Sequence, residues 1–166
     1  MNQTVIGSVF RVGDSVINSS EFKAAYCQIH HKTTTVGDHS FYVACASLCI
    51  CNFLGHIGIN TNKKDMINAA LCHDLGILGR SEKFSSSMQM MKEHPKDSVP
   101  IAREILGEDD NKRVEDIISH HMWPATPLSF PRSREAYVIT VADKYCAVME
   151  RLFKKKMPRR EEFMTL

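Results

Sequence analysis

The chain lacks the features that would place it in a membrane, a secretory pathway or a nucleic-acid complex. No stretch approaches the ~18 uninterrupted apolar residues that a membrane-spanning helix needs, and no basic start followed by an apolar run opens the chain. The net charge is only +2 over 166 residues, which is too small to make nucleic acid or a membrane surface the expected partner. We therefore expect a cytoplasmic protein with neither kind of partner, monomeric or oligomeric.

The chain also lacks the paired cysteines of a zinc or disulfide site. Six cysteines are present, and four fall within apolar helical patterns, where thiols behave as small hydrophobic residues. Cys45 and Cys49 are one helical turn apart, Cys51 points elsewhere, and no second pair follows. This pattern predicts buried core rather than a cysteine metal site.

The composition is that of an ordinary globular domain. Hydrophobic residues make up 43% and charged residues 24% of the sequence, both typical values. Because no internal repeat or linker divides the chain, residues 1–166 are predicted to form one domain. Its ligand-bearing core is expected at 36–153, after a short, extended lead-in over 1–18 and before a basic tail at 154–160.

Apolar residues recur at three- and four-residue spacing along most of the chain, which indicates helices. Start and stop signals predict helices over 21–28 (capped by Ser19 or Ser20), 36–56, 62–75, 94–106, from Asp110 or Asn111 to 122, and 133–153. The polar stretch 80–93 is predicted as a loop with at most one helical turn. The expected fold is an all-α bundle of six or seven helices without a convincing sheet.

One His-Asp dipeptide, His73-Asp74, ends the helix predicted after Asn62. The imidazole nitrogen can bind one metal ion, and the neighbouring carboxylate can bridge to a second. A single dipeptide of this kind carries little information by itself. Its significance depends on whether other helices supply further ligands.

Four predicted helices carry metal-competent side chains on otherwise apolar faces. These are His39, His73 with Asp74, His120 with His121, and Asp143, and His94 adds a position at a predicted helix start. A lone histidine on such a face is usually a core residue, but two buried aspartates without partners would cost several kcal/mol each. Since no lysine or arginine lies on these faces, a shared cation at the bundle centre is favoured. Nitrogen and carboxylate ligands suit Fe, Mn, Zn, Co or Ni.

The order of these residues resembles the HD-domain superfamily of metal-dependent phosphohydrolases, over about 105 of the 166 residues. The segments around His39 (Asp38-His39-Ser40) and Asp143 (Ala142-Asp143-Lys144) resemble the family's first and last ligand helices. The pairs His94-Pro95 and His120-His121 resemble its two-metal members. The segments starting at His121 and Arg134 are similar to small stand-alone bacterial HD proteins.

The resemblance implies an HD-like helical bundle around a central metal site, and hydrolysis of a phosphate ester or anhydride by a water activated at two metals. One ion would be held by His39, His73, Asp74 and Asp143. Asp74 would bridge to a second ion, held by His94, His120 and His121, of which His121 has the better helical phase. The expected cofactor is two divalent transition metal ions, Fe or Mn first, and the expected substrate is a phosphorylated small molecule such as a nucleotide.

The sequence departs from the HD-GYP group of this superfamily. Ile77 stands three positions after Asp74, where that group has a lysine, and the Gly-Tyr-Pro signature is absent. Cleavage of a cyclic dinucleotide is therefore not expected. Thr35, four residues before His39, is not an acid, which argues against a third ion.

Several further residues are candidates for the reaction itself. Asp74 and Lys144, which follows Asp143, are the predicted catalytic residues. The predicted substrate contacts are Arg80, Lys83, Trp123, Arg134 and His31. For the three cations, the alternative is a solvated surface charge; for Trp123, with Phe130, it is ordinary packing of a proline-rich loop. His30 or His31, in a loop before the first ligand helix, would protonate a leaving group.

Two other functions fit the same residues. Some proteins of this superfamily use a mixed-valent di-iron centre to activate oxygen, and the ligand set barely separates that chemistry from hydrolysis. A non-catalytic ligand-binding or regulatory domain is the third reading, and it predicts no stoichiometric metal.

Overall fold

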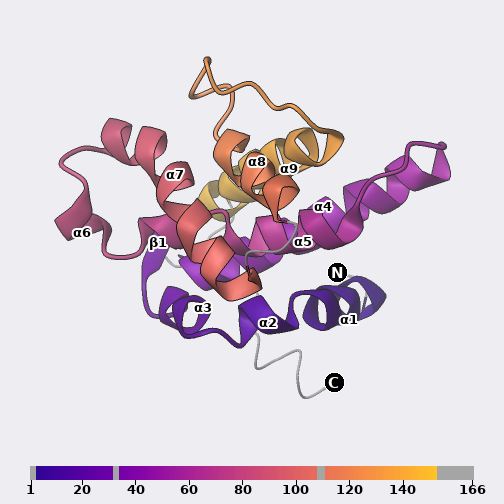
Figure 1. The fold of residues 1–166 in the computed structure, drawn as a ribbon, viewed down its shortest axis with the longest axis horizontal. Helices are drawn as coiled ribbons and strands as arrows, with labels where there is room; N and C mark the ends of the chain where they lie inside the picture. The colour runs from indigo at the N-terminus through magenta and orange to yellow at the C-terminus, as the bar shows by residue number, and fades with distance from the viewer. Residues whose placement is uncertain (1–2, 32–33, 108–110, 153–166) are drawn as a thin grey trace.

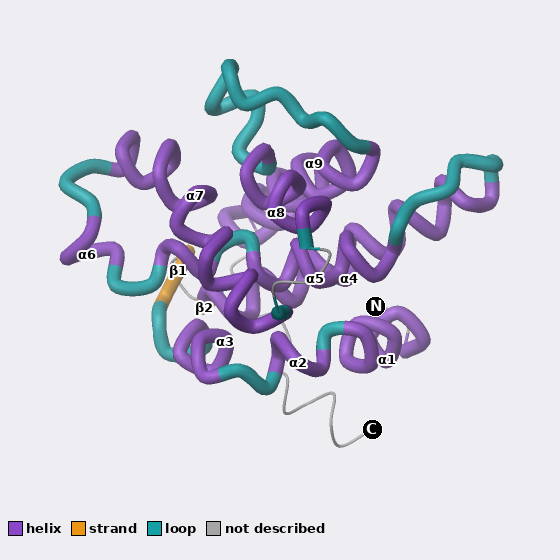
Figure 2. Tube along the Cα trace, in the orientation of Figure 1, coloured by secondary structure: helices purple, strands orange, loops and turns teal. Residues whose placement is uncertain are grey.

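The computed structural model describes residues 3–31, 34–107 and 111–152. Within these residues the chain forms nine α-helices, one short 3-10 helix and a two-stranded antiparallel ribbon (Figures 1 and 2). The all-α prediction is confirmed, with more helices than expected. No helix in the described part of the chain is long and apolar enough to cross a membrane.

The core is built around α4 (Val36–His56), which packs against α5 (Lys63–Cys72) and α9 (Arg134–Leu152). Side chains at the starts of α4 and α5 accept hydrogen bonds from otherwise unpaired backbone N–H groups. Thr35 Oγ1 accepts from Asp38 N at 3.1 Å, and Asn62 Oδ1 accepts from Asp65 N at 3.1 Å. The sequence predicted all three helices; Phe153 and the basic stretch 154–160 lie outside the described residues.

A second group of helices lies across α5. The 3-10 helix η1 (Leu75–Ile77) follows α5 and packs against α7 (Ser87–Leu106), which also contacts α8 (Lys112–His120). α8 packs in turn on α5, and Figure 1 shows α7 and α8 beside the central helices. The ends of α5 and α8 and the middle of α7 therefore meet near one point.

The N-terminal residues form helices, so the predicted extended lead-in is wrong. α1 (Gln3–Val12) and α2 (Asp14–Ile17) precede α3 (Ser20–Ala25), which Ser19 caps as predicted. α1 packs on α4 and α5, and its buried residues recur at helical spacing: Val5, Ile6 and Val9. Gly7 looks like a helix breaker in the sequence, but it lies on the exposed face of α1.

A short ribbon follows α3, where the sequence predicted no strand. β1 (Ile29–His31) pairs antiparallel with β2 (Thr34–Thr35), which leads directly into α4. The backbone N–H of Val36 also donates to the carbonyl of Gln28 at 2.9 Å. The pairing was hard to predict because each strand is only two or three residues long and depends on partners outside it.

α7 begins earlier than predicted. α6 (Arg80–Lys83) is the single helical turn expected in the polar stretch, but the next helix starts at Ser87. Ser86 Oγ accepts from the backbone N–H of Gln89 at 3.1 Å and caps the helix. The pair His94-Pro95 therefore lies inside α7 rather than at its start. A proline lacks the N–H that a helix interior uses, which favoured the wrong assignment.

α8 also ends earlier than predicted, at His120 rather than at Trp123-Pro124. His121 is its C-terminal capping residue, and its backbone N–H still donates to the carbonyl of Ile118 at 3.4 Å. The loop predicted over 122–131 then leads to α9. His121 is thus held by the last turn of the helix.

Gly76 sets the close packing of η1 against α7. A Cβ atom at this position would overlap the carbonyl oxygen of His94 and lie 2.7 Å from the backbone nitrogen of Ser98. The Ser98 hydroxyl accepts from Gly76 N at 2.9 Å and lies 2.7 Å from the carbonyl oxygen of His73, to which it can donate. These contacts fix the distance between the segment after His73 and the middle of α7.

We predict that Gly76→Ala lowers the free energy of unfolding by about 1–3 kcal/mol, because the added methyl group meets backbone atoms that cannot turn aside. Gly7→Ala is the matched control, since nothing lies within 4 Å of the added atom. That change should leave stability unchanged or raise it by about 0.5–1 kcal/mol. Urea denaturation measures both, and equal stability of the two variants would contradict the packing described here.

Candidate metal centre

Six of the predicted ligands converge at the centre of the helical bundle. They come from five helices and the turns that end them, and each is at most 7% exposed: His39 from α4, His73 and Asp74 from the end of α5, His94 from α7, His121 from the end of α8, and Asp143 from α9. A buried cluster of histidine and aspartate side chains is of the kind that forms a metal site.

Asp74 lies in the middle of this cluster and faces histidines with both carboxylate oxygens. Its Oδ2 atom is 3.5 Å from His73 Nε2 and 3.9 Å from His39 Nε2. Its Oδ1 atom is 3.2 Å from His94 Nε2 and 3.7 Å from His121 Nε2. The cluster therefore has two halves, which share this one carboxylate.

Asp143 belongs to the half that faces Oδ2. Its Oδ1 atom is 3.0 Å from His39 Nε2 and 3.9 Å from His73 Nε2. The three ligand atoms all lie within 4.8 Å of one another. In the other half, His94 Nε2 and His121 Nε2 are 3.1 Å apart.

Hydrogen bonds to the backbone fix the orientation of three of these rings. The Nδ1 atoms of His73, His94 and His121 each lie 2.7 Å from a backbone carbonyl oxygen three or four residues earlier in the chain. These carbonyl groups belong to Ala70, Met90 and Ile118, respectively. A carbonyl only accepts, so each Nδ1 carries the hydrogen, and the Nε2 of the neutral ring has a free lone pair. All three Nε2 atoms point to the cluster, as in histidines that bind metal.

The unsatisfied atoms of the cluster fit a bound cation. His73 Nε2 is buried and has no hydrogen-bond partner among the described residues, a costly state for a polar atom. The Nε2 atoms of His94 and His121 lie 3.1 Å apart. Metal bonds of roughly 2.0–2.2 Å place adjacent ligand atoms of one ion about 3 Å apart, so both observations agree with a transition metal.

The charges of the cluster are those that a cation requires. Burial would raise the pKa of the Asp74 and Asp143 carboxyl groups, but the nearby histidines, with Lys144 beside Asp143, outweigh burial and hold both pKa values far below their usual range. Burial lowers the pKa of His73 and His121. At neutral pH the carboxylates are therefore ionised and these two rings are neutral.

His39 differs from the other rings because a carboxylate lies at each of its nitrogens. Nε2 is 3.0 Å from Asp143 Oδ1, and Nδ1 is 2.9 Å from Glu150 Oε1. Burial alone would lower the pKa of His39, but the hydrogen bonds to Asp143 and Glu150 outweigh it and raise the pKa to about 10. Without an ion, His39 is thus protonated and bonded to both carboxylates.

His120 stands apart from the six. Its side chain is 13% exposed, and its Nδ1 lies 2.6 Å from the carbonyl oxygen of Asp116 and 3.4 Å from Asp116 Oδ1. The ion pair of its side chain in the described residues is with Asp116, whereas the Nε2 atoms of His94 and His121 lie 3.2 and 3.7 Å from Asp74 Oδ1. Its role as a ligand stays a prediction.

The predicted catalytic lysine lies at the cluster. Lys144 Nζ is 2.6 Å from Asp143 Oδ2 and donates to the carbonyl of His121 at 3.2 Å. Its side chain is 37% exposed, so it connects the buried cluster with solvent. Lys144 therefore lies directly against one of the six converging residues.

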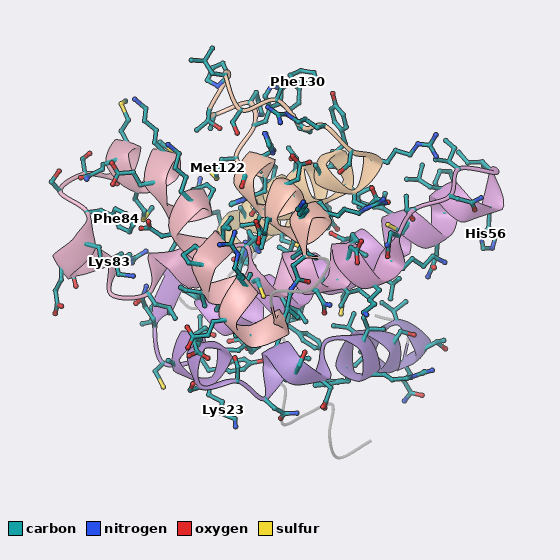
Figure 3. The ribbon with its side chains drawn as sticks, viewed as in Figure 1. Lys23, His56, Lys83, Phe84, Met122 and Phe130 are labelled. Carbon is teal, nitrogen blue, oxygen red and sulfur yellow. The ribbon has the colours of Figure 1, made fainter. Side chains whose placement is uncertain are left out.

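The other predicted substrate contacts are spread over the surface. Arg80 donates to the carbonyl of His30 at 3.3 Å, and Arg134 donates to that of Asn60 at 3.1 Å. Lys83 is exposed on α6, at the edge of the molecule (Figure 3). The side chain of His31 lies outside the described residues. Within the part of the chain that the structure covers, neither Lys83 nor Arg134 makes a hydrogen bond or an ion pair with a residue of the cluster.

Trp123 packs with two other aromatic rings. Its ring centroid lies 5.4 Å from that of Phe130 and 6.2 Å from that of Tyr137, both in edge-to-face geometry. Phe130 is 54% exposed, and Figure 3 shows it on the loop that leaves the body of the bundle. The contacts agree with ordinary loop packing, and stacking on a substrate ring stays a prediction.

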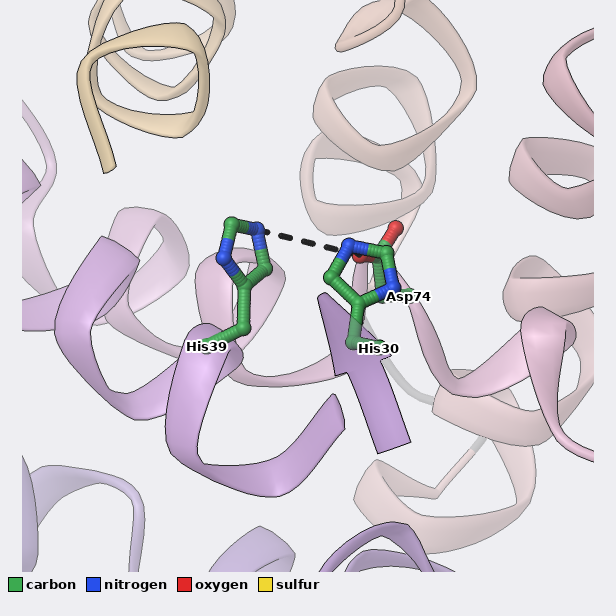
Figure 4. Close-up of side chains that lie close together, drawn as sticks. All are labelled: His30, His39 and Asp74. Atoms are coloured by element: carbon green, nitrogen blue, oxygen red, sulfur yellow. Dashed lines mark ion pairs between the residues drawn. The ribbon is translucent and has the colours of Figure 1, made fainter. Parts of the chain in front are cut away.

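Two residues next to the cluster were not among the predicted ligands. His30 was expected only as a proton donor in a loop, yet its Nε2 lies 3.5 Å from Asp74 Oδ2 (Figure 4). Glu150, on α9, was not among the predicted site residues, yet its Oε1 lies 2.9 Å from His39 Nδ1. It follows Asp143 by two helical turns, which is the signal that could have linked it to His39. The sequence has no comparable signal for His30.

A comparison with known protein families agrees with this geometry. The HD domain profile matches residues 36–148, which is more than half of the chain. The chain belongs to the HD domain family. HD domains are generally metal-dependent phosphohydrolases. No curated protein and no solved structure gave a match.

The matched region contains all six converging residues of this HD domain but neither His30 nor Glu150. Both therefore belong to segments that flank the matched region. Glu150 comes from the last turn of α9, and His30 from β1.

The high pKa of His39 predicts that metal binding releases protons. Below a pH of about 10, an ion must displace the proton that His39 holds. We therefore expect apparent metal affinity to rise with pH, by about tenfold per unit for one displaced proton. Calorimetry in buffers of different ionisation enthalpy counts the protons, and affinity independent of pH between about 6.5 and 8.5 would contradict this.

We also predict that Glu150→Gln weakens metal binding at the half that contains His39. The amide cannot accept as strongly from Nδ1, so the ring becomes a poorer and less well oriented ligand; changes of this kind typically cost about 10–100-fold in affinity. Glu104→Gln, at an exposed position of α7, is the matched control. Competition with a chelator measures both, and indistinguishable affinities would show that Glu150 does not support the site.

Proposed function

We propose that this HD domain is a phosphohydrolase that uses two divalent metal ions sharing Asp74. The observation that carries the proposal is that the two oxygens of Asp74 face different histidines at 3.2–3.9 Å. The first ion would be held by His39, His73, Asp143 and Asp74 Oδ2. The second would be held by Asp74 Oδ1, His94 and His121, with His120 as a further candidate.

The donor set supports a transition metal rather than Mg²⁺ or Ca²⁺, because histidine nitrogens outnumber carboxylates. Cys72 precedes His73, but burial raises the pKa of its thiol, so it remains a neutral core residue. Fe or Mn is the first expectation, and Zn, Co and Ni fit the same ligands. Cys45, Cys49 and Cys51 form no group of converging ligand atoms in the described residues.

When bound, two such ions lower the pKa of a water molecule towards neutrality and neutralise charge on phosphate oxygens. The chain's own residues would do the rest. Asp74 and Asp143 would supply negative charge inside the bundle, and Asp74 would join the two halves. The Lys144 ammonium, which lies beside Asp143 at the edge of the cluster, would contact a phosphate oxygen.

The proposed substrate is a phosphorylated small molecule, with a nucleotide as the first candidate. Arg80, Lys83, Arg134, Trp123 and His31 remain candidate contacts to its phosphates or its base. Ile77, which replaces the lysine of HD-GYP proteins, is 2% exposed and offers no polar group to a phosphate. Cyclic dinucleotides are therefore not the proposed substrates.

A mixed-valent di-iron oxygenase could use the same ligands, and it is the principal competing function. Hydrolysis needs no oxygen and works with several divalent ions. The oxygenase requires iron in two oxidation states. Non-catalytic ligand binding would leave the protein without stoichiometric metal.

The test of function starts from protein purified without oxygen and loaded with Fe²⁺ or Mn²⁺. A panel of phosphomonoesters, phosphodiesters and nucleotides should reveal phosphate release that depends on the ion. Oxygen uptake with a candidate substrate, together with a mixed-valent electron paramagnetic resonance signal, would contradict the proposed hydrolase function. Those results would indicate a di-iron oxygenase instead.

We predict that Asp74→Ala removes metal from both halves, because the variant loses the one carboxylate that they share. Cys49→Ala, at an exposed position of α4, is the control and should bind metal like the unchanged protein. Metal analysis after gel filtration gives both values. Full metal content and activity in the Asp74 variant would show that the site is assigned wrongly.

A further inference from the structure

The most informative unassigned side chain is that of His30. It belongs to β1, six residues before the region that matches the HD domain. Its side chain is only 9% exposed. A histidine from outside the family's core is thus buried against that core.

His30 approaches the same carboxylate oxygen as the ligands of the first half. Its Nε2 lies 3.5 Å from Asp74 Oδ2, and its ring centroid lies 4.7 Å from that of His39. The ligand atoms of His30, His39 and Asp74 all lie within 4.8 Å of one another. Figure 4 shows the three side chains pointing toward one another from two separate segments and the end of α5.

The backbone around His30 is held on two sides. Toward α4, Ile29 pairs with Thr35 in the ribbon, and Gln28 accepts from Val36 N. This places His30 beside the first turn of α4, which carries His39. The position of the ring therefore does not depend on its own contacts alone.

On the other side, the same segment is tied to the residues that follow Asp74. The Gln28 side chain donates to the carbonyl of Ile77 at 3.0 Å and accepts from Gly79 N at 2.8 Å. Arg80 donates to the carbonyl of His30 itself. β1 is thus attached to both elements that supply His39 and Asp74.

We propose that His30 is an additional ligand of the first ion, contributed by the N-terminal ribbon. This inference rests on the proposed two-metal site. An imidazole nitrogen is a ligand of the same class as those of His39 and His73. With His30, the first ion has five protein donors, whereas the second has the three supplied by Asp74, His94 and His121.

This difference separates the roles of the two ions. Sites surrounded by protein ligands are typically structural, whereas catalytic sites keep a position open for water or substrate. The first ion would be nearly closed and bound more tightly. Substrate would then bind mainly at the second ion.

Co²⁺ provides the test, because its visible spectrum changes with the number of ligands. We expect His30→Ala to bind two Co²⁺ ions, with altered absorption bands, and to lose one of them to a chelator about tenfold more readily or more. His56→Ala, at an exposed position at the end of α4 (Figure 3), is the control and should match the unchanged protein. An unchanged spectrum and chelator resistance in His30→Ala would overturn the proposal.

The variant His30→Gln distinguishes two possible roles of His30: binding the metal, or donating a hydrogen bond to Asp74. Glutamine can still donate to the carboxylate but is a poor metal ligand, so its Co²⁺ spectrum should match that of His30→Ala. A spectrum restored to that of the unchanged protein would overturn the proposal in favour of a positioning role. Circular dichroism of the same samples identifies any misfolded variant. If His30→Ala is misfolded, the test uses His30→Gln, because glutamine is closer in size to histidine and should preserve the fold.

The controls also distinguish this proposal from the proposed function. If Asp74→Ala loses both ions while His30→Ala behaves like the unchanged protein, the two-metal site stands and only the role of His30 is wrong. If the unchanged protein binds no Co²⁺, both the site and the ligand role are wrong.

Discussion

The carboxylate of Asp74 faces two sets of histidine nitrogens at once, and the rest of the bundle holds it in that position. A buried carboxylate is costly unless a cation or several hydrogen-bond donors satisfy it. Here the surrounding histidines come from α4, α5, α7 and α8. Because no single helix could supply them, the site exists only when the whole bundle is assembled.

Backbone atoms do much of the positioning. The Nδ1 atoms of His73, His94 and His121 bond to carbonyl oxygens of their own helices, so each ring is oriented by the element that carries it. The Ser98 hydroxyl and the absence of a side chain at Gly76 bring α7 against the segment after Asp74. The relative positions of the two halves of the cluster are therefore determined by helix packing rather than by loops.

The sequence predicted what depends on helical periodicity and missed what depends on contacts between segments. Apolar faces at three- and four-residue spacing indicated the helical fold, and the order of the histidines and aspartates on those faces carried the resemblance to the family. Gly7 and Pro95 were misleading, since an exposed glycine and an interior proline look like helix boundaries. The contact between His30 and Asp74 could not be predicted, because the position of His30 depends on the pairing of β1 with β2 and on the hydrogen bonds of Gln28.

The most direct test of the two-metal site is anomalous X-ray scattering from crystals of the protein loaded with Mn²⁺ or Fe²⁺. The structure leads us to expect two peaks, one on each side of the Asp74 carboxylate. The first should lie among His39, His73 and Asp143, and the second beside His94 and His121. A single peak would contradict the shared carboxylate, and no peak within this cluster would contradict the metal centre itself.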